Sequence, residues 1–214
     1  TLTTKYNVLF NGKEAFAVGK QILEQAYEDN FYELIPVEPI NLRGENIDES
    51  SIVPGFDRAE EKAVKAIQKH SMNINGNQYN RQIDAAYLLL GKARYFDRRF
   101  FPALEAFNFL LKSGANQSIF IQGKIWREKT NIRLQNDELA IQNLRPLAKS
   151  LNLGNQFYPL ANATVAEAFI NLKKRDSAAY YMKRAALASP KRRSKARYLF
   201  ISGQLFESLE KTDS

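Results

Sequence analysis

The chain has 214 residues, of which 44% are hydrophobic and 25% are charged, and this balance excludes an intrinsically disordered protein. It has no cysteine and a single histidine, so disulfides, thiolate metal sites, cysteine nucleophiles and multi-histidine metal centres are excluded. The net charge of +8 is unevenly distributed, because ten basic residues and one acid, Asp176, fall between Asn171 and Arg197. The basic character therefore belongs to one stretch of the chain.

Residues 1–28 are predicted to form a divergent helical hairpin. Asn11–Gly12 is a turn signal. After it, apolar residues recur every three or four positions from Ala15 to Tyr27, which is the pattern of an amphipathic helix. We therefore expect two helices that meet at Asn11–Gly12.

Residues 29–56 are predicted to be an acidic, proline-containing insertion. Pro36, Pro39 and Pro54 block a helix, and six acidic residues stand against one basic residue. A connection of this length is uncommon inside a compact array, and it is usually functional or wrapped on the surface. Apolar residues such as Phe31 favour wrapping over disorder.

Residues 57–80 are predicted to be a helix followed by a loop. Asp57 is a suitable N-cap, and Glu60, three residues later, completes the capping-box relation. The loop contains a second turn signal, Asn75–Gly76.

Residues 81–214 carry a repeated spacing of small residues. The sites are Gly91, Thr130, Ala166 and Gly203, which are 39, 36 and 37 residues apart. Each of the first three is followed by an alanine and then by bulky apolar residues, whereas the chain ends before the fourth partner. A fixed period in this range is typical of a solenoid of stacked helix pairs.

This repeated spacing matches the tetratricopeptide pattern, which has a small residue in the first helix and Ala, a bulky residue, Ala and Pro in the second. We therefore expect an all-α fold, a right-handed α-solenoid of tetratricopeptide-like hairpins that is truncated in its last repeat. Breaks are expected near residues 113–116, 153–156 and 189–193. Both ends of the chain look cut, so we expect a fragment of a longer protein.

Solenoids usually bind along the inner groove that the first helix of each hairpin lines. The polar residues that this register places there are Lys92, Lys124, Arg127, Asn131, Glu167 and Gln204. Their mixed charge fits a peptide or protein ligand better than a polyanion.

The basic stretch forms a second candidate surface. Its residues are Lys173, Lys174, Arg175, Lys183, Arg184, Lys191, Arg192, Arg193, Lys195 and Arg197. They fall at the turn of the third hairpin and around its exit, which lie at opposite ends of a hairpin, and this argues against one tight phosphate clamp. A solvated face, or attraction to an acidic protein or lipid surface, is favoured over nucleic-acid recognition.

Catalytic motifs are missing from the sequence. It has no glycine-rich phosphate loop, no nucleophile elbow and no zinc-binding helix. The closest acid pairs, Glu60–Glu61 and Asp137–Glu138, are sequence neighbours that point in different directions on a helix. We therefore expect a protein that is not an enzyme, with no cofactor, no metal and no small-molecule substrate.

Several strings resemble the N-terminal region of the SprE/PorW lipoproteins, tetratricopeptide proteins of gliding motility and type IX secretion in Bacteroidetes. The strings are Tyr6–Gly12 (YNVLFNG), Asp29–Pro39 (DNFYELIPVEP), Phe56–Met72 (FDRAEEKAVKAIQKHSM), Tyr79–Leu111 and Lys124–Ile141 (KIWREKTNIRLQNDELAI). They span most of the chain and are not generic repeat consensus.

The resemblance implies a component of the secretion and gliding machinery at the periplasmic face of the outer membrane. It implies partners among the translocon and ring proteins, and an anchor through a lipidated cysteine upstream of Thr1. No catalytic residues are carried over. The alternative reading is a solenoid adaptor that binds a polyanion, nucleic acid or anionic lipid, through the basic third repeat; an enzyme such as a peptidoglycan-cleaving solenoid ranks third.

Overall fold

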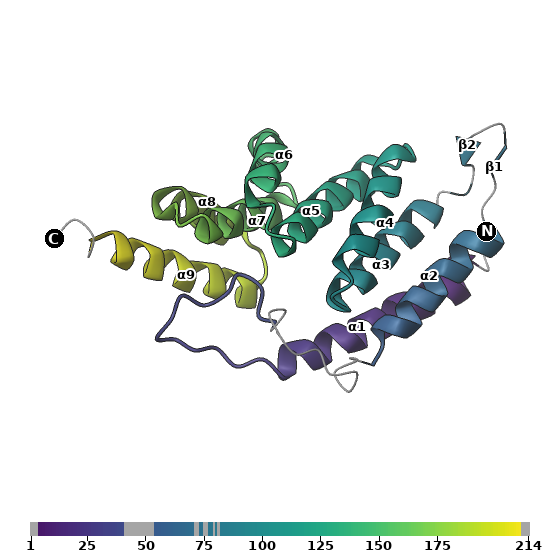
Figure 1. The fold of residues 1–214 in the computed structure, drawn as a ribbon, viewed down its shortest axis with the longest axis horizontal. Helices are drawn as coiled ribbons and strands as arrows, with labels where there is room; N and C mark the ends of the chain where they lie inside the picture. Colours follow the sequence, from purple (N-terminus) through teal and green to yellow (C-terminus); the bar gives the residue numbers. More distant parts are fainter. Residues whose placement is uncertain are drawn as a thin grey trace. The chain divides into compact units, whose positions relative to one another are not determined.

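The computed structural model describes residues 4–40, 54–70, 73–74, 77–78, 80 and 82–210. In these ranges the regular secondary structure is helical, apart from the two-residue antiparallel pair β1 (Asn73–Ile74) and β2 (Asn77–Gln78), and Figure 1 follows the helices in chain order. The helices are η1 (Thr4–Leu9), α1 (Phe10–Gln25), α2 (Phe56–His70), α3 (Gln82–Phe96), α4 (Phe100–Lys112), α5 (Gln117–Arg133), α6 (Asp137–Ser150), α7 (Tyr158–Asn171), α8 (Arg175–Ala188) and α9 (Arg192–Glu210). Helices that are consecutive in the chain pack on one another, which is consistent with an α-solenoid.

The chain divides into two compact units. Unit 1 comprises residues 1–27 and 40–130, and unit 2 comprises residues 28–39 and 131–214. Helix α5 passes from one unit into the other. Among the described helices, none combines the length and the apolar character that crossing a bilayer requires.

The predicted turn at Asn11–Gly12 is wrong, because both residues lie inside α1 and the chain is helical from Thr4 to Gln25. Gly12 serves a helix contact instead: a Cβ there would meet Leu89 Cδ2 at 2.9 Å and Lys62 Cβ at 3.0 Å. Gly12 has to be small because α2 and α3 contact it closely. The hairpin expected within residues 1–28 therefore does not form in residues 4–25, and α1 packs against α2 instead.

Helix α2 confirms the predicted helix, but it begins at Phe56, so that Asp57 lies in its first turn and not at the predicted N-cap position. Its alanines Ala59, Ala63 and Ala66 have no exposed surface, so they let neighbouring helices approach closely. The predicted loop turn Asn75–Gly76 and residues 41–53 of the predicted insertion lie outside the described residues.

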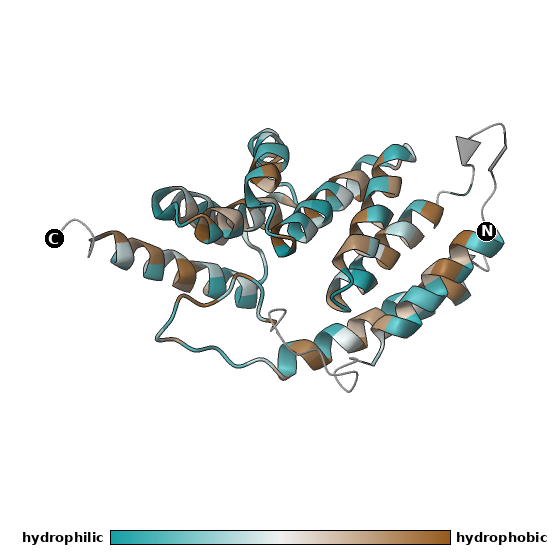
Figure 2. Ribbon diagram, in the orientation of Figure 1, coloured by the Kyte–Doolittle hydropathy of each residue, from teal (hydrophilic) through white to brown (hydrophobic). Residues whose placement is uncertain are grey.

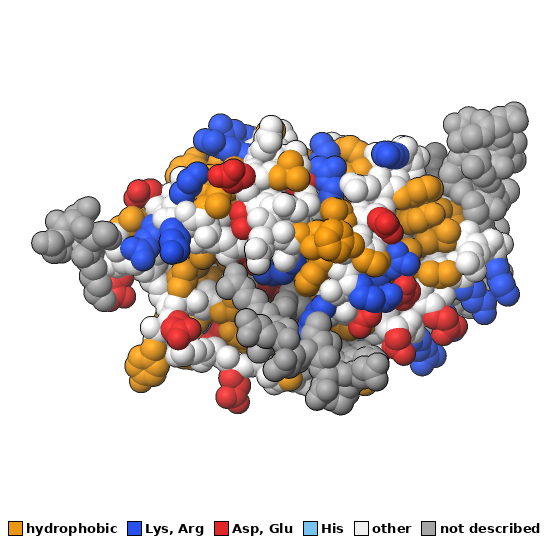
Figure 3. All heavy atoms as spheres, viewed as in Figure 1, with side chains coloured by type: hydrophobic (Ala, Val, Ile, Leu, Met, Phe, Trp, Pro, Cys, Tyr) orange, Lys and Arg blue, Asp and Glu red, His pale blue; other side chains and the backbone are white. Residues whose placement is uncertain are grey.

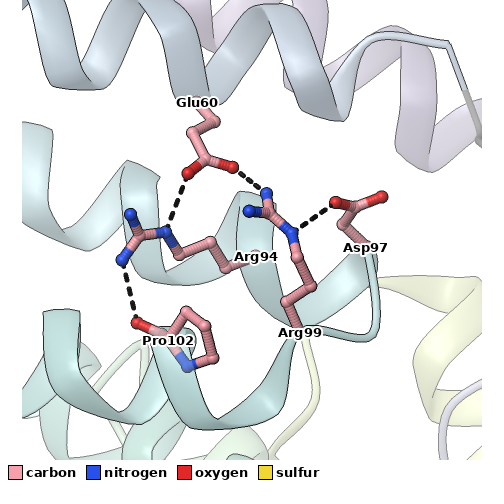
Figure 4. A network of polar contacts seen from close by, with 5 residues as sticks. All are labelled: Glu60, Arg94, Asp97, Arg99 and Pro102. Carbon is pink, nitrogen blue, oxygen red and sulfur yellow. Dashed lines mark hydrogen bonds and ion pairs between the residues drawn. The ribbon is translucent and has the colours of Figure 1, made fainter.

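A polar network ties α2 to the α3–α4 hairpin (Figure 4). One oxygen of Glu60 accepts a hydrogen bond of 2.9 Å from Nε of Arg94, and the other pairs with Arg99. Arg94 also donates to the carbonyl of Pro102 at 3.1 Å, and Arg99 pairs with Asp97 at 2.7 Å. The Glu60 carboxylate thus joins three helices through two guanidinium groups.

The core of unit 1 is aromatic. Tyr95, Phe96 and Phe107 are buried, and Trp126 meets both Tyr95 and Phe96 edge to face at 5.3 and 5.7 Å between ring centroids. Gly91 makes room for this core, because a Cβ on it would lie 2.4 Å from the Phe107 ring. The small residue predicted at this helix crossing therefore accommodates an aromatic ring of the second helix.

In unit 2, α7 packs against both α6 and α8, and α8 packs against α9. Residues 161 to 169 of α7 are buried without a break, as expected of a helix that neighbours cover on several sides. Ala166 and Ala178 have no exposed surface. Hydrophobic and hydrophilic residues alternate along α9 (Figure 2).

The same backbone turn closes each hairpin of the repeat region. Arg98, Gln135 and Lys173 have positive φ values of 59°, 62° and 59°. After each of them, the next amide donates to a carbonyl five residues back: Arg99 to Arg94, Asn136 to Asn131 and Lys174 to Phe169, all at 2.9 Å. This is the main-chain pattern of a Schellman ending, and it recurs at intervals of 37 and 38 residues.

The breaks predicted between hairpins are confirmed. Helix α4 ends at Lys112 and α5 begins at Gln117; α6 ends at Ser150 and α7 begins at Tyr158; α8 ends at Ala188 and α9 begins at Arg192. Of the predicted insertion, residues 29–39 belong to unit 2, which agrees with the expected wrapping on the fold.

Candidate docking face on unit 2

The six predicted inner-groove residues fall into both units. Lys92, Lys124 and Arg127 lie in unit 1, and Asn131, Glu167 and Gln204 lie in unit 2. Two of the unit 2 residues, Glu167 and Gln204, take part in the contacts that hold residues 28–39. We call these residues segment 28–39, and we call Arg133, Glu167, Arg197, Tyr198 and Gln204 the docking face.

Segment 28–39 follows α1 as the dark blue trace that reaches α9 in Figure 1. It forms neither helix nor strand. The Gln204 side chain of α9 binds its backbone: Nε2 donates to the carbonyl of Glu33 at 2.7 Å, and Oε1 accepts from the amide of Ile35 at 3.2 Å. One amide side chain thus satisfies both a backbone acceptor and a backbone donor of an extended segment.

Arg197 of α9 holds the start of the segment. Its two terminal nitrogens donate to the two carboxylate oxygens of Asp29 at 2.8 and 2.5 Å, and its Nε donates to the carbonyl of Pro36 at 3.2 Å. The ion pair is mostly shielded, with 13% of the Arg197 side chain and 20% of the Asp29 side chain exposed. Arg197 was predicted to belong to the basic surface; the structure shows that it is engaged in this bidentate pair.

Arg133, at the end of α5, holds the other end of the segment. It lies 2.7 Å from a carboxylate oxygen of Glu167 and 3.4 Å from one of Glu38. Sequence reasoning missed Arg133, because nothing in the repeat pattern singles out the last residue of a helix. The acidic composition of residues 29–56 was the available signal that a basic partner should exist.

Apolar contacts complete the interface. Ile35 is buried with 3% of its surface exposed, and the ring of Phe31 meets Phe200 edge to face at 5.3 Å. Tyr198 of α9 is buried, and its burial together with the nearby carboxylates of Glu38 and Glu167 raises its pKa to about 12. The docking face therefore combines cations, an amide and an apolar contact, the elements of a peptide-binding surface.

In unit 1, the other predicted residues have partners of their own. Lys92 donates to Oε1 of Gln122 at 3.1 Å and lies 5.2 Å from the centroid of Trp126. Burial, aided by the charges of nearby lysines, lowers the pKa of Lys92 to about 8. Lys124 lies 4.8 Å from the centroid of Phe120, and Arg127 pairs with its neighbour Glu128 at 2.6 Å.

The remaining basic residues lie largely on the surface. The exposed ones are Lys173, Lys174, Arg175, Lys183, Lys191, Arg192, Arg193 and Lys195. In Figure 3, Lys and Arg side chains over α6–α8 are interspersed with acidic and uncharged ones. Arg184 is half-buried and lies 5.4 Å from the centroids of both Tyr158 and Tyr180.

Four basic side chains, from two helices and a turn, meet at a cavity of about 590 Å³ between α6, α7 and α8. They are Arg145, Lys149, Lys174 and Arg184, and Asp176 is the acid among the lining residues. Sequence reasoning placed Lys174 and Arg184 in one basic stretch but missed their convergence with the two residues of α6. Asn162 also lines the cavity, and its buried Oδ1 has no hydrogen-bond partner among the described residues.

Within the described ranges, no group of three or more His, Cys, Asp or Glu residues could hold a metal ion. Comparison with models of known protein families gives no match to this chain, and comparison with curated proteins gives none either.

Proposed function

We propose that the chain is a non-enzymatic scaffold that binds other proteins through a right-handed α-solenoid of tetratricopeptide-like hairpins. The repeated spacing of small residues and the left-handed turn common to the three hairpins support this architecture. Both describe one structural unit used repeatedly, and such arrays present extended binding surfaces.

The observation that carries the proposal is the occupied docking face of unit 2. There, the side chain of Gln204 bonds to backbone groups of an extended segment, while Arg197 binds a carboxylate of it. A surface that holds one peptide in this way has the chemistry to hold another.

We place the scaffold in the type IX secretion and gliding machinery, where it links the outer-membrane translocon to the trans-envelope ring. The resemblance of strings such as Asp29–Pro39 and Phe56–Met72 to the SprE/PorW lipoproteins supports this placement. The proposed location is the periplasmic face of the outer membrane, with a lipidated cysteine upstream of this chain as the anchor.

The test is affinity capture from envelope extracts of a gliding Bacteroidetes species, with the tagged chain as bait. Translocon and ring proteins are the expected prey, and their recovery should persist after nuclease treatment. Ribosomes or RNA as the dominant prey would contradict the proposal.

The alternative function is binding of a polyanion, and the cavity between α6, α7 and α8 is the observation in its favour. Four basic side chains line it against one acid. If all four contact phosphates, affinity for a short single-stranded RNA or an anionic lipid vesicle should fall roughly a hundredfold between 50 and 200 mM salt.

Lys149→Glu should abolish such binding, whereas Lys183→Glu, which changes an exposed lysine of α8 outside the cavity, provides the control. A protein partner on the docking face should respond much less to salt, because the ion pairs there are largely shielded from solvent. Unchanged binding in Lys149→Glu would remove the cavity from consideration.

A further inference from the structure

Segment 28–39 has the composition of a ligand for the surface on which it lies. It carries four acidic residues and no basic one, and Pro36 and Pro39 keep it out of helix. The unit with which it packs is the one that contains the basic stretch. Charge complementarity therefore matches the segment to unit 2.

The contacts divide into two kinds. Gln204 and Nε of Arg197 bind backbone atoms of Glu33, Ile35 and Pro36, so they would hold any extended chain in this register. Arg197 and Arg133 bind the carboxylates of Asp29 and Glu38, which select for acidic side chains. Glu38 stands nine positions after Asp29, a span of up to about 30 Å in an extended chain.

One apolar side chain fixes the position between these ends. Ile35 is buried, whereas Phe31 is 61% exposed and Tyr32 is fully exposed. The docking face thus selects for an acidic residue, a buried aliphatic residue six positions later, and a second acidic residue three positions after that.

We propose that the docking face is the binding site for an extended acidic peptide of a partner protein, and that segment 28–39 is an intramolecular competitor that occupies it until the partner displaces it. This inference rests on the proposed function as a protein-binding scaffold and names the chemistry of its ligand. A tethered competitor acts at an effective concentration near the millimolar range, so it suppresses weak ligands and admits those that bind better.

The test uses the whole chain and a fluorescent peptide of residues 28–39 with blocked ends. An opened variant, Asp29→Ala with Glu38→Ala, weakens the tethered segment and leaves the docking face intact. We expect the peptide to bind the opened variant at least about tenfold more tightly than it binds the parent chain, as measured by fluorescence anisotropy. Equal affinity for the two chains would overturn the proposal.

Two further substitutions in the opened variant locate the peptide. Arg197→Ala should abolish binding, because it removes the bidentate partner of the first acid. Lys195→Ala removes an exposed cation from the same helix and should leave the affinity unchanged. Equal losses in both variants would indicate non-specific attraction to a basic surface and would contradict the site. Circular dichroism should show the same helical content in all of these variants.

Hydrogen exchange provides a readout that does not depend on the added peptide. The amide of Ile35 donates to the Gln204 side chain, so Gln204→Ala should speed its exchange by about tenfold or more. Lys195→Ala should leave it unchanged. No effect of Gln204→Ala would mean that the segment is not held on this face in solution.

Oligomeric state distinguishes a tethered competitor from a segment exchanged between copies. A parent chain that is monomeric by light scattering supports the intramolecular arrangement. A dimer that dissociates in the opened variant would show that a second copy supplies the segment, and this would overturn the inference.

Envelope capture with both chains separates the inference from the function on which it rests. Greater recovery of secretion proteins by the opened variant supports both. Equal recovery of secretion proteins by the two chains agrees with the scaffold function but overturns the docking face as its binding site. If neither chain recovers secretion proteins, the proposed function is contradicted, and the peptide experiment alone decides the inference.

Discussion

Lys92 is the residue whose charge its surroundings disfavour most clearly. Burial, together with repulsion from Lys20, Lys129 and Lys13, lowers its pKa from 10.5 to about 8. Between these two values the unfolded state binds more protons than the folded state. Stability contributed by this group therefore rises with pH across that window.

Replacement of Lys92 by methionine should remove this pH dependence. Between pH 8 and 10.5, the free energy of unfolding of the parent chain should rise relative to that of Lys92→Met by roughly 3 kcal/mol. Urea unfolding at several pH values measures the free energy of unfolding of both chains. The titration of all other groups contributes equally to the two chains and cancels in the difference between them. If the free energies of unfolding of the two chains changed in parallel with pH, Lys92 would have its ordinary pKa in the folded chain.

Arg197 shows what residue-level reasoning from sequence lacks. Its position in a run of ten basic residues predicted a solvated surface, and most of that run is indeed exposed. Arg197 differs because its partner, Asp29, stands 168 residues earlier in the chain. No local pattern reports a pairing over that distance.

At the scale of the element, two glycines of the same repeat position have opposite environments. A Cβ on Gly91 would meet the ring of Phe107 at 2.4 Å, whereas one on Gly203 would meet nothing within 4 Å. Gly91→Ala should destabilise unit 1 by about 1–3 kcal/mol through overpacking. Gly203→Ala, inside the exposed face of α9, should stabilise by up to about 1 kcal/mol through helix propensity.

Thermal unfolding of both variants checks this pair of predictions. Stabilisation by Gly91→Ala would mean that Phe107 moves aside at little cost, and the close helix crossing would then lose its importance for the fold.

Helix boundaries in the repeats were predictable because each depends on neighbours in the sequence. The three breaks between hairpins follow from turn-forming residues that are close together in the sequence. The turn residues Arg98, Gln135 and Lys173 close hairpins of nearly constant length. Asn11–Gly12 was misread because the same dipeptide suits a tight turn and a close helix contact. Only the atoms of Leu89 and Lys62, distant in sequence, decide between these two uses.

At the scale of the whole molecule, the division into two units has a measurable consequence. Glu60 bridges α2 to Arg94 and Arg99 entirely within unit 1. Glu60→Gln should leave two guanidinium groups underpaired and destabilise this unit by about 1–3 kcal/mol. Hydrogen exchange should quicken in α2, α3 and α4 and remain unchanged in α7 and α8.

Glu61→Gln is the matched control, since Glu61 is exposed and pairs with the adjacent Lys62. It should alter exchange in neither unit. Faster exchange of α7 and α8 in Glu60→Gln would show that the chain unfolds as one cooperative body.

The helical architecture was predictable from the sequence, because period and composition are properties of the chain itself. The docking face was predictable only in part. Gln204 and Glu167 emerged from the repeat register, but the register does not reveal that the acidic insertion lies against them. That arrangement depends on Arg133, Arg197 and Asp29, which belong to separate parts of the sequence.

The shared left-handed turn has a practical consequence for engineering. The hydrogen bonds that close it join main-chain atoms, and the side chains of Gln135 and Lys173 are exposed, so these two side chains are dispensable for its geometry. A dye or an affinity handle could be attached at Gln135 or Lys173 without disturbing the packing of its hairpin. Because the chain has no native thiol, one engineered cysteine at such a position would be labelled uniquely.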